Sequence, residues 1–179
     1  ALDAQQRGER GAIYDKSMER TSPQLAILEH DLHGAFGGDK PLQLFLQPKV
    51  HAIGGECDAA EGLLRWERVP GEWVAPPVVL GLIDRLGMRH RFNRWLFQHA
   101  AQALARLDAE GFDITLSINL SATDLYDAEV PDLIGQALST WGVPAHQLCL
   151  EITETDMVDD AGEGVADVLC RLRLLGVKL

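Results

Sequence analysis

Three largely apolar segments of this 179-residue chain have a strand-like pattern in which a carboxylate or amide side chain falls on the more polar face. Glu61 stands in "AAEGLLRW", Asn119 in "SINLS" and Glu151 in "LEITET". Carboxylate and amide oxygens without paired histidines or cysteines suit Mg²⁺ or Mn²⁺ better than zinc. A bound cation would also let several carboxylates lie close together without taking up protons. The three residues are therefore candidate ligands of a divalent metal ion.

Arg65 falls on the same strand face as Glu61, about 13 Å further along, since strand side chains alternate and each residue rises about 3.3 Å. Its planar guanidinium could hold an anionic substrate group, such as a phosphate, that bridges toward the metal. Glu154 is out of phase with Glu151, so we expect it to support the site or to cap the end of the strand. A structural interpretation stays open: Glu61 and Arg65 could form a buried ion pair or lie near a solvated barrel mouth, and Asn119 could bind loop backbone.

Short strands alternate with helices from residue 42 onward. The first two strands follow each other across a short turn, and Trp73 is expected in a loop. Helices between the remaining strands imply parallel pairing with right-handed crossovers, which leaves a doubly wound sheet or a barrel. We expect strands at 42–50, 56–67, 114–121 and 148–155, helices at 76–87, 92–107, 130–141 and 159–176, and the start of a strand at 177–179.

The faces of the strands favour the barrel. In the segment 114–121, apolar side chains alternate with Thr, Ser and Asn, so one face is apolar and the other polar. A sheet covered by helices on both faces would carry near-continuous apolar runs instead. In a barrel, the polar faces can line a site near the carboxyl ends of the strands. The predicted fold is α/β, a (β/α)8 TIM-like barrel that is present only in part.

The gross composition excludes several classes of partner. A formal net charge of -11 argues against binding to a nucleic acid polymer or an anionic membrane. No apolar run reaches the roughly 18 residues of a membrane span, and no signal-peptide core is present, so we expect a cytoplasmic location, with a tether elsewhere in a parent protein left open. Cys57, Cys149 and Cys170 are odd in number and lie in apolar segments, which predicts buried thiols and no disulfide framework.

Four ordered motifs, "LQLFLQPKV", "AEGLLRW", "SINLS" and "LEITET", resemble the N-terminal half of an EAL-domain cyclic di-GMP phosphodiesterase. The resemblance covers about 42–179. The preceding "GAIYDKSMER" and the helix that follows it are similar to the tail of a GGDEF-type domain and the helix that leads into an EAL barrel. The resemblance implies residues 1–22 as the tail of a preceding domain or a linker, 23–40 as the lead-in helix, and 41–179 as the EAL domain.

The same resemblance implies a reaction and its residues. Members of the family hydrolyse cyclic di-GMP to linear pGpG with two Mg²⁺ or Mn²⁺ ions, which activate a water and stabilise charge together. An upstream GGDEF-type or sensory domain is implied in the parent protein. The implied roles are metal binding for Glu61, Asn119 and Glu151, catalysis for Glu61 and Glu151, dinucleotide contacts for Gln47, Leu64 and Arg65, and support for Glu154.

Two departures from the family pattern qualify these expectations. Gly62 replaces the usual alanine of the name-giving triplet, and we expect a packing change with Glu61 kept. The family pattern also continues past "GVKL" into further acidic and lysine motifs, so we expect these 179 residues alone not to hydrolyse the dinucleotide. Alternatives are an EAL-like receptor or interaction module without catalysis, and an unrelated barrel scaffold. Exposed strand edges predict a homodimer or a domain-exchanged assembly.

Overall fold

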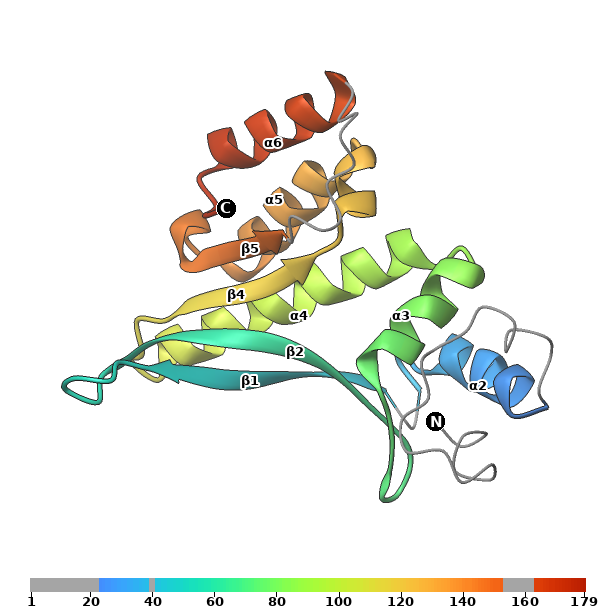
Figure 1. The fold of residues 1–179 in the computed structure, drawn as a ribbon. Coiled ribbons are helices and arrows are strands. Elements are labelled where there is room, and N and C mark those ends of the chain that lie inside the picture. Colours follow the sequence, from blue (N-terminus) through green and yellow to red (C-terminus); the bar gives the residue numbers. More distant parts are fainter. Residues whose placement is uncertain (1–22, 39–40, 153–162) are drawn as a thin grey trace.

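The computed structural model describes residues 23–38, 41–152 and 163–179, and its elements alternate between strands and helices (Figure 1). In chain order they are α2 (Pro23–Gly34), β1 (Leu42–Val50), β2 (Cys57–Val69), β3 (Glu72–Val74), α3 (Pro76–Arg85), α4 (Arg89–Ala109), β4 (Thr115–Leu120), the 3-10 turn η2 (Ala122–Tyr126), α5 (Val130–Trp141), the 3-10 turn η3 (Ala145–Gln147), β5 (Leu148–Ile152) and α6 (Glu163–Leu175).

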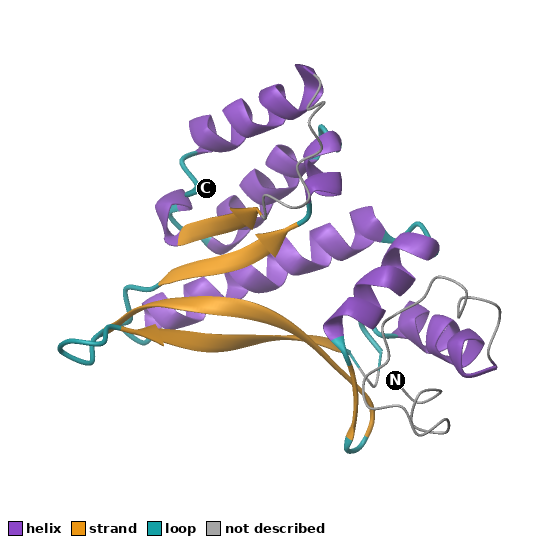
Figure 2. Ribbon diagram, viewed as in Figure 1, coloured by secondary structure: helices purple, strands orange, loops and turns teal. Residues whose placement is uncertain are grey.

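One mixed sheet organises the fold. Its strands lie in the order β1-β2-β4-β5. The short strand β3 pairs with the last residues of β2, from Trp66 to Val69. β1 and β2 are antiparallel, and Figure 2 shows their connecting turn projecting beyond the helices. β2, β4 and β5 are parallel, because helices separate them in the chain. Across the described residues the sheet stays open, so the predicted α/β fold, a barrel present in part, is confirmed.

The apolar face of the sheet packs on the helices. Ala60, Leu64 and Trp66 of β2 are buried in the core, and so are Leu116 and Ile118 of β4. Helix α4 supplies the opposing layer, and Figure 1 shows it running alongside the strands. In β2 the intervening residues are more exposed, as period-two alternation requires, whereas in β4 Asn119 is exposed and Ser117 is buried. The polar strand face is therefore available for a site.

Two local predictions were wrong. Trp73 lies in β3 rather than in a loop, because Gly71 at φ 81° makes a tight turn that folds 72–74 back onto β2. Cys57 and Cys170 are exposed and Cys149 is partly exposed, so they are not buried thiols. Cys170 lies off the α6 face that buries Val165, Val168 and Leu172, a consequence of helical periodicity.

The two ends of the described chain are tied to the sheet. Helix α2 is held by ion pairs from Asp31 to Arg68 of β2, at 3.3 Å, and from Glu29 to Arg85 of α3, at 2.5 Å. At the other end Lys178 pairs in parallel with Cys149, which confirms the expected start of a strand. In the portions of the chain described here, no helix has the length and apolar character needed to cross a membrane.

Candidate metal and substrate site

Sheet register brings the three predicted oxygen donors onto adjacent strands. Glu61 of β2 is aligned with Ser117 of β4, and Asn119 of β4 is aligned with Glu151 of β5. The Nδ2 atom of Asn119 donates a hydrogen bond of 3.0 Å to Oε1 of Glu61. We refer to Glu61, Asn119 and Glu151 as the donor cluster. Residues separated by up to ninety positions in sequence thus meet on one polar face of the sheet.

Lys49 connects the cluster to β1. Its Nζ atom donates to Oε1 of Glu151 at 2.7 Å and to Oγ of Ser117 at 3.2 Å. The hydrogen bond to Glu151 raises the pKa of Lys49, with further attraction from Glu151 and Glu61. The same contact lowers the pKa of Glu151. Sequence reasoning missed Lys49, although strand alternation places it on the same face as Gln47.

The donor cluster fits a hard divalent cation in chemical type. Two carboxylates and an amide are oxygen donors suited to Mg²⁺ or Mn²⁺, and the ammonium of Lys49 already supplies positive charge beside Glu151. Asn119 turns its amide nitrogen to Glu61, and a half rotation of that amide would present its oxygen instead. Within the described ranges, no group of three or more His, Cys, Asp or Glu residues could hold an ion, and the donor cluster contains two such residues, Glu61 and Glu151.

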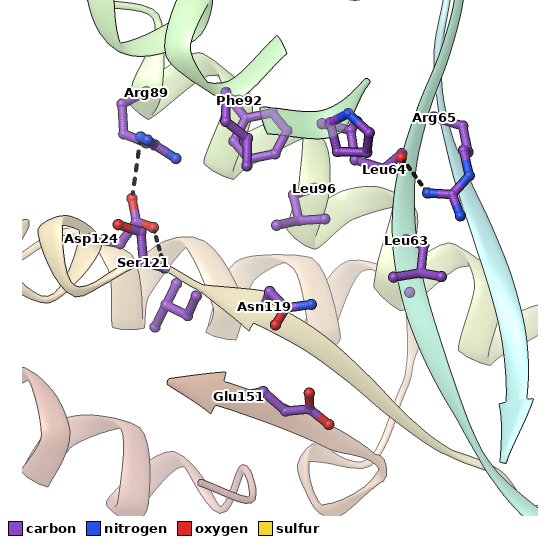
Figure 3. A pocket seen from close by; sticks show the side chains of 14 residues that line it. Leu63, Leu64, Arg65, Arg89, Phe92, Leu96, Asn119, Ser121, Asp124 and Glu151 are labelled. Carbon is purple, nitrogen blue, oxygen red and sulfur yellow. Dashed lines mark hydrogen bonds and ion pairs between the residues drawn. The ribbon is translucent and has the colours of Figure 1, made fainter. Parts of the chain in front are cut away.

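A pocket of about 290 Å³ opens beside the cluster (Figure 3). Asn119 and Glu151 line it from β4 and β5, and Arg65 lines it from β2. The guanidinium of Arg65 donates to the carbonyl oxygen of Leu64 at 2.9 Å. The alternative ion pair between Glu61 and Arg65 is not formed in the described part of the chain, where Glu61 accepts a hydrogen bond from Asn119. Arg65 retains donors that could bind an anion.

The remaining predicted residues occupy different environments. Gln47 is exposed on β1 and aligned with Glu61, so it borders the cluster. The Leu64 side chain belongs to the buried core, although the residue also contributes to the pocket wall. Glu154 lies outside the described residues. The structure thus brings Gln47, Glu61 and Arg65 onto neighbouring parts of one face, with Leu64 supporting that face from behind.

A buried polar network that sequence reasoning missed closes the far end of the pocket. Asp124 of η2 accepts hydrogen bonds from Nδ2 of Asn93, at 2.8 Å, and from the backbone N of Ser121, at 2.9 Å. Figure 3 shows Arg89 directed at the same carboxylate. Burial raises the pKa of Asp124, while Asn93 and Arg89 oppose the rise. Because Ser121 follows β4 directly, this network fixes the strand end next to Asn119.

Comparisons with known proteins agree on one family. The family model described as "EAL domain" matches residues 29–179. A cyclic di-GMP phosphodiesterase of Pseudomonas aeruginosa, PA2567, is 30% identical over 177 residues, which cover 99% of this chain and 30% of that protein. The bifunctional diguanylate cyclase/cyclic di-GMP phosphodiesterase MucR of the same organism is 30% identical over 176 residues, covering 97% of this chain and 25% of MucR. The chain therefore spans less than a third of these curated relatives.

Solved structures share the fold. The phosphodiesterase PaMucR, solved as a c-di-GMP complex, superposes with a TM-score of 0.65 at 29% identity, covering 76% of this chain and 56% of that one. The FimX EAL domain of Xanthomonas citri, in complex with c-diGMP, gives a TM-score of 0.73 at 20% identity, covering 91% and 61% of the two chains. At that identity the FimX likeness concerns the fold alone. In both superpositions the match extends over little more than half of the solved chain.

Proposed function

This chain belongs to the EAL domain family, and on that premise we propose that it forms part of a phosphodiesterase domain that hydrolyses cyclic di-GMP to linear pGpG. One observation carries the proposal. Glu61, Asn119 and Glu151 come from three neighbouring strands and lie together on the polar face of the sheet. Arg65 lines the adjoining pocket with an anion-binding group, so cation and phosphate chemistry would meet there.

Each residue of the site has a role in this proposal. Two Mg²⁺ or Mn²⁺ ions, when bound, would supply an activated water and neutralise charge on the phosphodiester. Glu61 and Glu151 offer carboxylate oxygens, and Asn119 offers its amide oxygen. Arg65 orients the phosphate through its planar fork, while Gln47 offers an amide to the dinucleotide. Leu64 holds the strand against the core, and Glu154 has the supporting role expected from the sequence.

The donor cluster leaves room for further ligands. Mg²⁺ demands near-octahedral coordination and keeps several waters, so three protein donors leave positions for water, substrate phosphate or other residues. Lys49 occupies part of this space by its contact with Glu151. The Oε1 atom of Glu151 would have to leave Lys49 before that oxygen could bind a cation.

The contact between Lys49 and Glu151 favours a second candidate function. An ammonium group 2.7 Å from the carboxylate gives Glu151 a counter-charge without any metal ion. A domain with such a contact could bind cyclic di-GMP through Arg65 and Gln47 and leave the phosphodiester intact. This second candidate is a receptor for the dinucleotide rather than a hydrolase.

The experiment that separates the two candidate functions uses the full-length protein that contains this sequence. The protein is incubated with cyclic di-GMP and Mg²⁺ or Mn²⁺, and pGpG is measured by chromatography. The hydrolase predicts pGpG formation that Glu61→Gln abolishes and that Glu110→Gln, at an exposed carboxylate on the end of α4, leaves unchanged. Binding of the dinucleotide without pGpG would select the receptor, and absence of both would reject both candidates.

We extend the proposal to the organisation of the protein. Residues 41–179 would form the EAL unit, 23–40 the helix leading into it, and 1–22 the tail of a GGDEF-type or sensory domain or a linker. The free cysteines support a cytoplasmic location. The outer edge of β1, which forms one end of the strand order, supports association through strand pairing in a homodimer or an exchanged assembly. Light scattering of the purified protein tests that association.

A further inference from the structure

Two exposed aromatic rings, one on β1 and the other on β3, contact each other across β2. Phe45 is 45% exposed and Trp73 is 48% exposed, although both are large apolar side chains. Their ring centroids are 5.8 Å apart and their planes are inclined by 74°, an edge-to-face contact. Such a contact holds the two rings in place while part of each ring surface stays open. We call Phe45 and Trp73 the aromatic pair.

The aromatic pair lies on the same face of the sheet as the donor cluster. Phe45 is aligned with Leu63 and Trp73 with Glu67. Leu63 and Glu67 are each an even number of residues from Glu61, so their side chains share its face. Paired residues on adjacent strands point to the same side of the sheet. A ligand lying along this face could therefore contact the aromatic pair and the donor cluster together.

Arg65 joins the aromatic pair to the candidate active site. A pocket of about 380 Å³ is lined by Phe45, Arg65, Trp73, Val74, Ala75 and Pro76. Arg65 also lines the pocket beside Asn119 and Glu151. Among the residues that the structure describes, no carboxylate lines the aromatic pocket, and the guanidinium is the one charged group in its wall. The fitting occupant has a flat aromatic group for the rings and an anionic group within reach of Arg65.

The strand that carries Trp73 is fixed in place. The carboxylate of Glu67 accepts a hydrogen bond of 2.7 Å from the backbone N of Gly71 at the turn before β3. Arg68 donates to both carboxylate oxygens of Glu72, at 2.7 and 2.9 Å. These contacts hold Trp73 before a ligand arrives, which reduces the entropy cost of binding.

We propose that the aromatic pair is a stacking subsite for one purine base of the cyclic dinucleotide, with the adjoining phosphate at Arg65. The inference rests on the proposed function for the identity of the ligand and names the residues that select its base. A purine presents a flat π face to the rings, and its phosphate supplies the negative charge that the guanidinium requires. Removal of one stacking ring is expected to weaken binding by about 5- to 150-fold.

Four variants test the proposal, with cyclic di-GMP, GMP and inorganic phosphate as probes and calorimetry as the measurement. Trp73→Ala and Phe45→Ala are expected to bind cyclic di-GMP and GMP about 5- to 150-fold more weakly than the unaltered protein does. Both variants should keep the unaltered affinity for inorganic phosphate. Trp73→Phe is expected to recover most of the loss because it restores a ring. Trp141→Ala, at an exposed tryptophan on α5, is the matched control and should bind all probes as the unaltered protein does.

The indole N–H resonance of Trp73, assigned from its absence in Trp73→Phe, gives a readout that is independent of hydrolysis. It should shift on addition of GMP. If cyclic di-GMP binds to Trp73→Ala and to Phe45→Ala as tightly as to the unaltered protein, the subsite is rejected while the proposed function stands. If cyclic di-GMP does not bind but GMP shifts the Trp73 resonance, the aromatic pair still stacks a purine base, while the proposed function and the identity of the ligand fall. If neither nucleotide shifts the resonance, or if the alanine variants lose only self-association, the subsite is rejected.

Discussion

Lys49 on β1 contacts Glu151 on β5, at opposite ends of the strand order, with 2.7 Å between Nζ and Oε1. Three strand spacings separate β1 from β5, which would amount to about 14 Å in a flat sheet. The two side chains bridge that span because the sheet curves with its polar face inside. The contact is therefore a consequence of the curvature expected of a barrel wall. It also links the first strand to the donor cluster.

Lys49→Met is expected to lower the free energy of unfolding by about 0.2–1 kcal/mol at pH 7 without metal, since both partners are over a third exposed and solvent screens them. The pKa of Glu151 is lowered from 4.5 and that of Lys49 is raised from 10.5. The contribution of Glu151 to the free energy of unfolding is thus present above pH 4.5 and is lost as the pH falls through the pKa of Glu151 in the folded state. The contribution of Lys49 is present below pH 10.5 and lost as the pH rises through its folded pKa.

Urea unfolding at pH 7 and at about pH 3 measures this difference. Lys178→Met is the matched control, because Lys178 donates to the hydroxyl of Thr115 rather than to a carboxylate. Mg²⁺ should stabilise Lys49→Met more than the unaltered protein, since Glu151 is then free. An unchanged metal effect in the variant would contradict competition between Lys49 and the ion.

Gly62→Ala is expected to destabilise the protein by about 1–2 kcal/mol through overpacking. An added Cβ would lie 3.0 Å from Cγ2 of Ile118 and 3.2 Å from Cδ1 of Leu44. Ile118 is fully buried and branched at Cβ, so it yields poorly. The gain from replacing a strand glycine, about 0.5–1 kcal/mol, does not offset this crowding. Thermal unfolding measures the net effect.

Gly81→Ala provides the contrast for Gly62→Ala. An added Cβ at Gly81, in helix α3, meets no atom within 4 Å. The alanine should therefore stabilise the protein by about 0.5–1 kcal/mol through higher helix propensity. Equal effects of the two substitutions would show that contacts with Ile118 and Leu44 do not determine the choice of glycine at position 62.

Asp124→Asn is expected to remove a pH dependence of stability on the acid side. Burial raises the folded pKa of Asp124 above 3.8, so the native state holds more protons than the unfolded state between those two values. The free energy of unfolding therefore falls as the pH rises through that window. Urea unfolding across it should show a flatter profile for Asp124→Asn, while Asp167→Asn, at an exposed carboxylate of α6, should keep the original slope.

Arg65→Lys is expected to weaken binding of cyclic di-GMP about tenfold. Lysine keeps the charge but loses the planar fork, which is comparable to one charged hydrogen bond. Stabilisation by Mg²⁺ should be unaffected, because Arg65 is not in the donor cluster. Arg94→Lys, on the exposed side of α4, serves as the control. Calorimetry measures the affinity of each variant for cyclic di-GMP. Equal affinities of Arg65→Lys and Arg94→Lys would show that Arg65 does not bind the phosphate.

Local patterns were sufficient for most elements and for the face of each strand. Alternation in β2 assigned Glu61 and Arg65 to one face and Leu64 to the other, because strand side chains point to opposite sides in turn. The three-residue strand β3 was missed because so short a segment has no period to detect. Its position depends on the turn at Gly71 and on pairing with β2, which are tertiary contacts.

The sequence by itself determined the α/β class, the family resemblance and the residue types of the candidate site, since these depend on local periodicity and on motifs within single segments. Only the tertiary structure decided which side chains meet. Register set Asn119 beside Glu61, curvature brought Lys49 to Glu151, and the fold of β3 placed Trp73 against Phe45. Such contacts join positions far apart in the chain, and their distances follow from strand pairing and sheet curvature, which no single segment encodes.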